Sequence, residues 1–102
     1  MARIHGLKVD WQFYDRVNRE EKKAELRLND RDFRRFDYLR LERIQPGFGN
    51  PGHQSFYQVT DTVTHEEFPE GLQPGYIMLS LRRCSQEECN LLFELPLKPV
   101  HS

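Results

Sequence analysis

Hydrophobic and polar positions alternate along residues 24–28, and this pattern predicts a strand. A period of two places successive side chains on opposite faces of a sheet. The apolar set is Ala24, Leu26 and Leu28, and the charged set is Glu25 and Arg27. We therefore expect the apolar set to face the core and the charged set to face solvent.

Four other segments also have strand-like patterns. Residues 4–9 form a short first strand, and residues 38–44 alternate around Leu39 and Leu41. Residues 55–64 are rich in β-branched and aromatic residues, which favour strands. Their apolar positions of one parity are Tyr57, Val59 and Val63. Residues 76–81 form a nearly unbroken apolar run, which is typical of a central strand covered on both faces.

Two helices are expected, one at each end of the chain. Asp10 has the side chain of an N-cap, and the helix after it carries Trp11, Phe13, Tyr14 and Val17 on one broad face. The run Ser85-Gln86-Glu87-Glu88 fits a capping box ahead of a short C-terminal helix. Residues 90–95 fit an edge strand equally well, and residues 96–102 are expected to form a loose tail.

The length of 102 residues fits a single domain with one core, and the mixture of strands and helices indicates the α+β class. No apolar run approaches the ~18 residues that cross a bilayer, so we expect a cytoplasmic protein that is not in the membrane. Cys84 and Cys89 match neither a redox pair nor a zinc site, and both are expected to be free. The sequence predicts no metal site and no cofactor.

Charge is distributed unevenly, although the net charge is only −1. Residues 1–43 hold twelve Lys and Arg against nine Asp and Glu, whereas residues 44–102 hold three against seven. Most of the cations are Arg, whose planar fork suits bidentate contacts to phosphate and carboxylate. Either these arginines bind an anionic ligand, or they pair with the interleaved acids on a solvated surface.

Several segments resemble a phage and bacterial family related to the ASCH branch of the PUA-like β-barrels. The resemblance runs from about residue 5 to residue 81. Its most specific part is the segment Glu25-Leu26-Arg27-Leu28-Asn29-Asp30-Arg31-Asp32-Phe33. Weaker matches are His5-Gly6-Leu7-Lys8, residues 37–42 and the Pro74-Gly75-Tyr76 strand.

The resemblance implies a small mixed β-barrel of about five strands with flanking helices. Residues 1–83 would form the ASCH/PUA-like domain, and residues 84–102 an extension packed on it or trailing from it. Related domains are associated with RNA, and one related bacterial group hydrolyses acetylated cytidine with a Lys, a Thr and a Glu. The Lys aligns with Lys22 and the Thr with Glu25.

The chain departs from these relatives in two ways that affect the implied cleft. Glu25 replaces the Thr, and no hydroxyl stands at positions 22–26. The Gly before the Lys-containing stretch is replaced near Glu20, and the Gly before the family's Asp is Phe36, so both turns are expected to be altered. Strict alternation also places Lys23, rather than Lys22, on the face of Glu25. The family alignment favours Lys22.

Nine residues are candidates for the cleft, and most of them also have a structural interpretation. Lys22 and Glu25 either perform acid–base catalysis or form an ion pair that lines the cleft. Asn29 and Arg31 either join Arg27 in binding a phosphate or base, or belong to a braced turn. Tyr57 and Trp11 either stack on a base or belong to the core, and His5 either borders the cleft or is structural. The ligand-binding candidates are Lys8, Arg27, Asn29, Arg31 and Tyr57.

Three functions follow from these candidates. The first is a domain that binds RNA or a nucleotide in the cleft. The second is an amidohydrolase that acts on a modified cytidine, with Lys22 and Glu25 as catalytic residues. The third is a phage-type protein that inhibits a host protein through its acidic segment 61–70 or the extension beyond residue 83. The sequence leaves the oligomeric state open.

Overall fold

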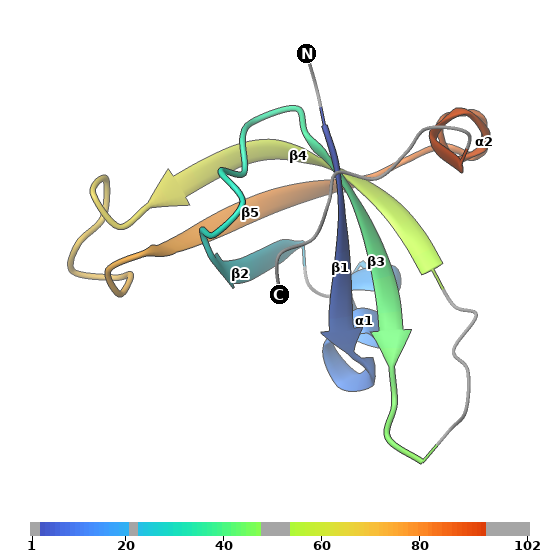
Figure 1. Ribbon diagram of the computed structural model, residues 1–102, viewed down its shortest axis with the longest axis horizontal. Helices are drawn as coiled ribbons and strands as arrows, with labels where there is room; N and C mark the ends of the chain where they lie inside the picture. Colours follow the sequence, from blue (N-terminus) through green and yellow to red (C-terminus); the bar gives the residue numbers. More distant parts are fainter. Residues whose placement is uncertain (1–2, 21–22, 48–53, 94–102) are drawn as a thin grey trace.

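The computed structural model describes residues 3–20, 23–47 and 54–93. These residues form a five-stranded mixed sheet with two helices (Figure 1). The elements are β1 (Ile4–Asp10), α1 (Trp11–Asn18), β2 (Ala24–Leu28), β3 (Tyr38–Ile44), β4 (Gln54–Thr64), β5 (Tyr76–Arg83) and α2 (Gln86–Phe93). The expected α+β class with a small barrel-like sheet is confirmed.

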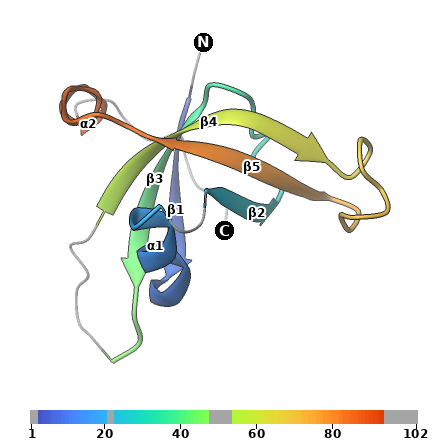
Figure 2. The ribbon, with the colours of Figure 1, turned by 180° about the vertical axis from the view of Figure 1, so that it is seen from behind.

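The order of strands in the sheet is β1-β3-β4-β5-β2. β1 and β3 run parallel, and every other neighbouring pair is antiparallel. The parallel connection from β1 to β3 passes through α1 and β2, so the two edge strands β1 and β2 are close in sequence. Figures 1 and 2 show the sheet curving into a half-barrel.

The main core fills the concave side of the half-barrel. Leu39 and Leu41 are fully buried there, as the alternation in 38–44 predicts. α1 covers one end of this core with Tyr14 and Val17, and Asp10 caps the helix by accepting a hydrogen bond from the Gln12 N–H. Phe13 is exposed, so the predicted broad aromatic face of α1 is wrong at that position.

A second cluster lies on the convex side and is covered by α2. It consists of Ile4, Phe56, Cys84 and Leu92. The capping box is confirmed, since Ser85 N donates to Glu88 Oε1 at 2.8 Å and Glu88 N donates to Ser85 Oγ at 3.2 Å. The alternative of an edge strand is therefore wrong for residues 90–93, which belong to α2. Among the described residues, no helix is long and apolar enough to cross a bilayer.

The two faces of β2 are the reverse of those expected from its alternation. Glu25 is 8% exposed, whereas Leu26 and Leu28 are 53% and 51% exposed. The pairing with β5 explains the reversal, because Glu25 stands opposite the buried Leu79 and shares its concave face. The period of two identifies the strand, but the register with β5 decides which side faces the core.

A β-bulge changes the parity of β4. The register with β5 shifts between Val59 and Asp61, which leaves Thr60 as the extra residue. Tyr57 and Val59 are therefore buried in the main core, but Val63 stands opposite Met78 on the convex face. The expectation that all three share one face is wrong for Val63. Met78 is also exposed, so β5 is not covered on both faces as predicted.

Two turns retain backbone conformations that favour glycine. Glu20 has φ of 61° and Phe36 has φ of 75°, both in the left-handed region. Both are positions at which the resemblance described above implies a Gly in related proteins. For a non-glycine residue this conformation costs about 1–2 kcal/mol.

The strain at Phe36 predicts an unusual preference for glycine over alanine. We expect Phe36→Gly to have a free energy of unfolding about 1 kcal/mol higher than Phe36→Ala, because both remove the exposed ring and only glycine adopts positive φ freely. Urea unfolding measures the difference. The matched pair at Phe13 in α1 should show the opposite sign, since glycine destabilises a helix relative to alanine. Equal stability of the two Phe36 variants would contradict the strain.

Candidate functional site

The two edge strands of the half-barrel are joined by arginine side chains from β2 and the turn after it. Arg27 Nη2 donates to the Lys8 carbonyl at 2.8 Å, and Arg31 Nη1 donates to the Gly6 carbonyl at 2.7 Å. Both acceptors belong to β1. We call this junction the seam, and we define it by Gly6, Lys8, Arg27 and Arg31.

The seam is basic, and its arginines retain unused donors. The Nε atoms of Arg27 and Arg31 are buried and have no hydrogen-bond acceptor among the described residues. The Arg31 side chain is only 12% exposed, and its Nε lies 3.8 Å from Asp30 Oδ1, which is too far for a hydrogen bond. Buried polar groups are normally bonded, so unsatisfied N–H groups in such a place require an explanation.

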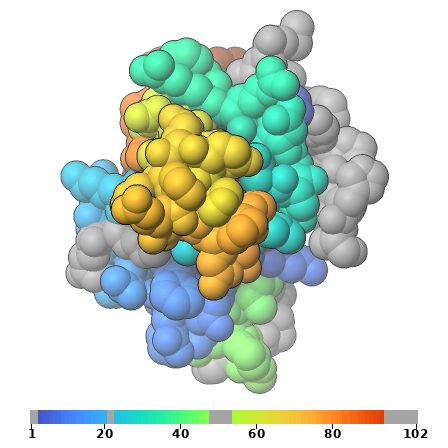
Figure 3. All heavy atoms as spheres, turned by 90° about the vertical axis from the view of Figure 1, so that its left-hand side faces the viewer, coloured from blue at the N-terminus to red at the C-terminus, as the bar shows by residue number. Residues whose placement is uncertain are grey.

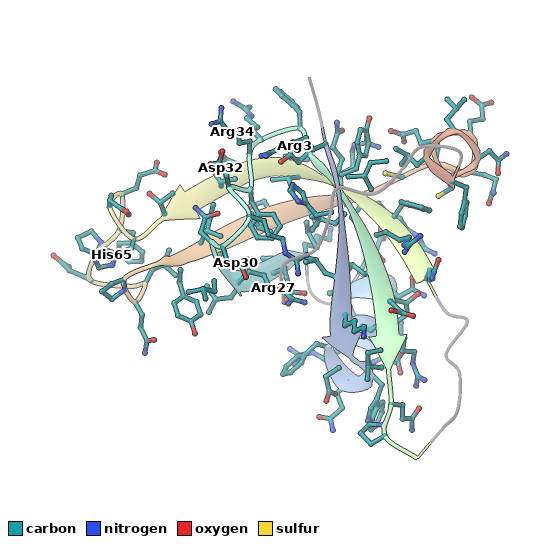
Figure 4. The ribbon with its side chains drawn as sticks, viewed as in Figure 1. Arg3, Arg27, Asp30, Asp32, Arg34 and His65 are labelled. Carbon is teal, nitrogen blue, oxygen red and sulfur yellow. The ribbon has the colours of Figure 1, made fainter. Side chains whose placement is uncertain are left out.

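Two further candidates flank the seam. Glu25 is buried two residues before Arg27, on the same face of β2. Lys8 contributes its carbonyl to Arg27 and has an exposed side chain on β1. The structure thus brings Lys8, Glu25, Arg27 and Arg31 together along the facing edges of the sheet, as Figure 4 shows for Arg27 beside β2.

Asn29 has the structural one of the two roles that the sequence left open, since it belongs to a turn. Its Oδ1 accepts a hydrogen bond from the Phe33 N–H at 3.1 Å, and its own N–H donates to the Gly75 carbonyl at 2.8 Å. The Asp30 N–H donates to the Leu28 carbonyl. These bonds shape the turn that positions Arg31, so Asn29 supports the seam through the backbone.

Tyr57 lies away from the seam and lines a separate pocket of about 300 Å³. Its side chain belongs to the main core, which corresponds to its structural interpretation, and only a small part of it borders the pocket. The pocket lies beside the C-terminal end of α1. Its other sides are formed by the residue before β2, by β4 at Tyr57 and by the C-terminal end of β5. Its lining residues are Val17, Glu20, Lys23, Tyr57, Leu81, Arg82 and Arg83.

A chain of hydrogen bonds fixes the floor of this pocket. Asn18 Oδ1 accepts from Ser55 Oγ at 3.0 Å and from the Tyr57 hydroxyl at 3.3 Å. Because the Ser55 hydrogen is directed to Asn18, the Tyr14 hydroxyl is the donor in its 2.7 Å contact with Ser55 Oγ. Burial raises the pKa of Tyr57, and the charge of Arg83 only partly offsets this effect. Tyr57 is therefore a neutral donor at physiological pH.

A buried carboxylate, Asp37, organises the turn before β3. Asp37 accepts hydrogen bonds from the Arg3 N–H at 3.1 Å, from His5 Nε2 at 2.9 Å and from the Arg34 N–H at 3.0 Å. Burial raises the pKa of Asp37, but the hydrogen bonds from His5, Arg3 and Arg34 outweigh burial, and the net pKa is lowered. His5 is buried in this network, which corresponds to its structural interpretation.

Charged side chains also gather on the surface above Asp37. Arg3 Nη2 donates to the Asp32 carbonyl, and Arg34 Nη2 donates to Asp32 Oδ2 at 2.9 Å. Figure 4 shows Arg3, Asp32 and Arg34 as one group, well separated from His65 in the loop that joins β4 to β5. Figure 3 views the molecule from the side on which that loop projects. The acids in this group satisfy the arginines, so the group is a surface ion-pair network.

Other expectations concern catalysis, metals and cysteines. Lys22 lies outside the described residues. Among residues 3–20, 23–47 and 54–93, no group of His, Cys, Asp or Glu side chains is arranged to hold a metal ion. Cys84 and Cys89 are both free, as expected. Burial raises the pKa of the Cys84 thiol to about 12, which keeps it protonated and unreactive.

Two features of the site were not selected from the sequence. The sequence indicates Asp37 only as part of the segment 37–42, because its partners Arg3 and His5 become its neighbours only through the parallel pairing of β1 and β3. Lys23 and Arg83 were missed as pocket residues. Strict alternation did place Lys23 on the face of Glu25, and the structure agrees, since Lys23 lines the pocket beside Tyr57.

Comparison with known proteins identifies one family. Residues 4–81 match the profile of a family described as a domain of unknown function, DUF3850. The match covers β1 to most of β5 and therefore includes the seam, whereas α2 lies beyond it. No curated protein matches the chain.

Proposed function

This chain belongs to the DUF3850 family, which is described as a domain of unknown function, and we propose that it is a PUA-like domain that binds RNA or a nucleotide along the seam. The candidate ligand-binding residues are Lys8, Arg27 and Arg31, with Glu25 buried beside them. Asn29 holds the turn that carries Arg31.

The buried, unsatisfied Nε groups of Arg27 and Arg31 carry this proposal. A guanidinium has five N–H donors, and each of these arginines donates one hydrogen bond to β1. Leaving a buried donor without an acceptor costs about 1–3 kcal/mol, and an anionic ligand would remove that cost. Phosphate oxygens are well matched to the arginine fork.

The remaining groups favour a nucleotide over a simple anion. Lys8 adds an exposed positive charge on β1, at the residue whose carbonyl Arg27 binds, and this charge can attract a phosphate backbone. Glu25 supplies carboxylate oxygens within the half-barrel, which can accept hydrogen bonds from the amino group of a base. Cations beside a buried acceptor offer contacts to both parts of a nucleotide.

Fluorescence anisotropy with a labelled short RNA tests the proposal. Arg27→Ala is expected to weaken binding about tenfold or more, because a charge-assisted hydrogen bond contributes roughly 1.5–3 kcal/mol. The slope of log affinity against log salt should also fall by about one for each phosphate contact that is lost. The same series with Lys8→Ala should show a smaller loss, since that side chain is exposed.

Arg16→Ala is the matched control, because Arg16 is an exposed arginine on α1 that takes no part in the two hydrogen bonds of the seam. Its affinity for RNA should equal that of the wild type. Wild-type protein that binds neither RNA nor any nucleotide or nucleoside would overturn the proposal. Equal losses in Arg16→Ala and Arg27→Ala would overturn the assignment of the seam.

A second candidate function is an amidohydrolase for acetylated cytidine, and the burial of Glu25 favours it. A carboxylate withdrawn from water is the type of group that serves as a general base. Lys22 is its proposed partner from the sequence. Incubation with N4-acetylcytidine should release acetate in the wild type and not in Glu25→Gln. Unchanged product formation in that variant would exclude Glu25 as the base.

A further inference from the structure

The pocket beside α1, which is separate from the seam, has the features of a second binding site. Val17, Leu81 and the Tyr57 ring give it an apolar floor, and Lys23, Arg82 and Arg83 give it a basic wall. Its volume of about 300 Å³ lies at the lower end of the range for small-molecule sites. We propose that this pocket receives one nucleotide, with the base against the apolar floor and the phosphate at Lys23 and Arg83.

The basic residues of the pocket have different roles, which their partners determine. Arg82 is held by Glu88, with Nη2 2.7 Å from Glu88 Oε2, and it also donates to Gln58 Oε1. Arg83 Nη1 donates to the Asn18 carbonyl at 3.0 Å, at the negative end of α1. Arg83 thus neutralises the helix end and keeps further N–H groups of its fork for a ligand.

Lys23 supplies the mobile positive charge. Its side chain is exposed, and its backbone is fixed because the Leu81 N–H donates to the Lys23 carbonyl at 2.9 Å. A lysine ammonium on a flexible stem can follow a phosphate group with little constraint on its direction. With Arg82 paired to Glu88, the pocket retains two cations against Glu20, which leaves it positively charged.

The floor is rigid enough to support a flat ligand. Asn18 holds the Tyr57 hydroxyl through its side chain and Arg83 through its carbonyl, so one residue positions both the floor and the wall. Glu20 stands at the rim with its N–H bonded to the Val17 carbonyl at 2.9 Å. Its carboxylate can accept hydrogen bonds from ribose hydroxyls or from an amino group of the base.

The pocket and the seam are connected along β2. Lys23, Glu25 and Arg27 have the same parity, so they form one row on the concave side, with Lys23 at the pocket and Arg27 at the seam. Successive members are about 6.5–7 Å apart along a strand. Lys23 and Arg27 are therefore about 13 Å apart along the strand, with Glu25 between them, and can contact phosphates of a single strand that are not adjacent. The inference therefore rests on the proposed function and adds where one nucleotide is bound.

NMR titration of the full chain tests the pocket directly. The probes are inorganic phosphate, uridine monophosphate, adenosine monophosphate and a short oligouridylate. We expect the mononucleotides to shift the amide signals of Val17, Tyr57 and Leu81. Lys23→Ala should weaken their binding about tenfold, since it removes one charge-assisted contact to phosphate. Lys23→Glu should weaken it further, and Arg16→Ala should leave it unchanged.

The outcomes separate the pocket from the seam. One outcome is that oligouridylate shifts only the signals around Arg27 and Arg31, with no change in Lys23→Ala. That result would overturn the nucleotide site in the pocket and leave the proposed function intact. Mononucleotide shifts at the pocket with no effect at the seam would support the pocket and overturn the seam. Pocket shifts with phosphate that equal those with the nucleotides would show an anion site without a base site, which would overturn the inference. If no probe binds, both proposals fail.

Discussion

Asp37→Asn is expected to lower the free energy of unfolding by about 3–5 kcal/mol at neutral pH, the usual cost of breaking a buried charge network. Asp37 is 2% exposed and accepts hydrogen bonds through both carboxylate oxygens. An asparagine has one oxygen, so its amide N–H groups would face other donors, either the Arg3 N–H or those of His5 and Arg34. Urea unfolding monitored by Trp11 fluorescence measures the loss.

The pH dependence of this loss has a definite sign. Because the pKa of Asp37 is lowered in the folded state, the unfolded chain binds the proton more tightly. The stabilisation from this carboxylate is therefore present above its unfolded pKa of about 4 and disappears as the pH falls through the folded value. The difference between wild type and Asp37→Asn should shrink below about pH 4.

Asp32→Asn provides the matched control for Asp37, since it makes the same chemical change in an exposed ion pair of the same turn. Its effect should stay within about 0.5 kcal/mol, as for other surface pairs. Two results would contradict the assignment. One is a comparable loss in both variants, and the other is an Asp37→Asn difference that stays constant down to low pH.

Leu92→Ala is expected to lower the free energy of unfolding by about 2–3 kcal/mol, which is typical of truncating a buried leucine. Leu92 is 7% exposed and packs in the second cluster with Ile4, Phe56 and Cys84. The ring of Phe93 also meets the ring of Phe56 edge-on, with the centroids 4.9 Å apart. α2 therefore completes the folded domain, although the family match ends before it.

The neighbouring Leu91 offers the control for Leu92, because it undergoes the same truncation at 67% exposure in the same helix. Chemical denaturation should show a change below about 0.5 kcal/mol for Leu91→Ala. Hydrogen exchange at the Cys84 amide, which donates to the Phe56 carbonyl at 3.0 Å, should accelerate only in Leu92→Ala. If Leu92→Ala lowers the free energy of unfolding as little as Leu91→Ala does, α2 is an extension that the domain does not need for its stability.

Local sequence determined most of the secondary structure. The alternation around Leu39 and Leu41 gives a strand with both leucines fully buried, and the Ser85–Glu88 capping box begins α2. These signals are local, because a period of two or a cap depends on residues within a few positions of one another. Arg27 and Arg31 also lie in one short segment of the sequence, and in the fold both bind carbonyls of β1.

The tertiary structure decided which faces became buried and what the site residues contact. Glu25 is buried because β2 pairs with β5 in a register that places it opposite Leu79, and Val63 reverses because of the bulge at Thr60. The bonds of Arg27 and Arg31 to β1, and of Asp37 to Arg3 and His5, join residues distant in the chain. Alternation specifies that two faces differ, whereas strand pairing and sheet curvature determine which face is enclosed and which charges meet there.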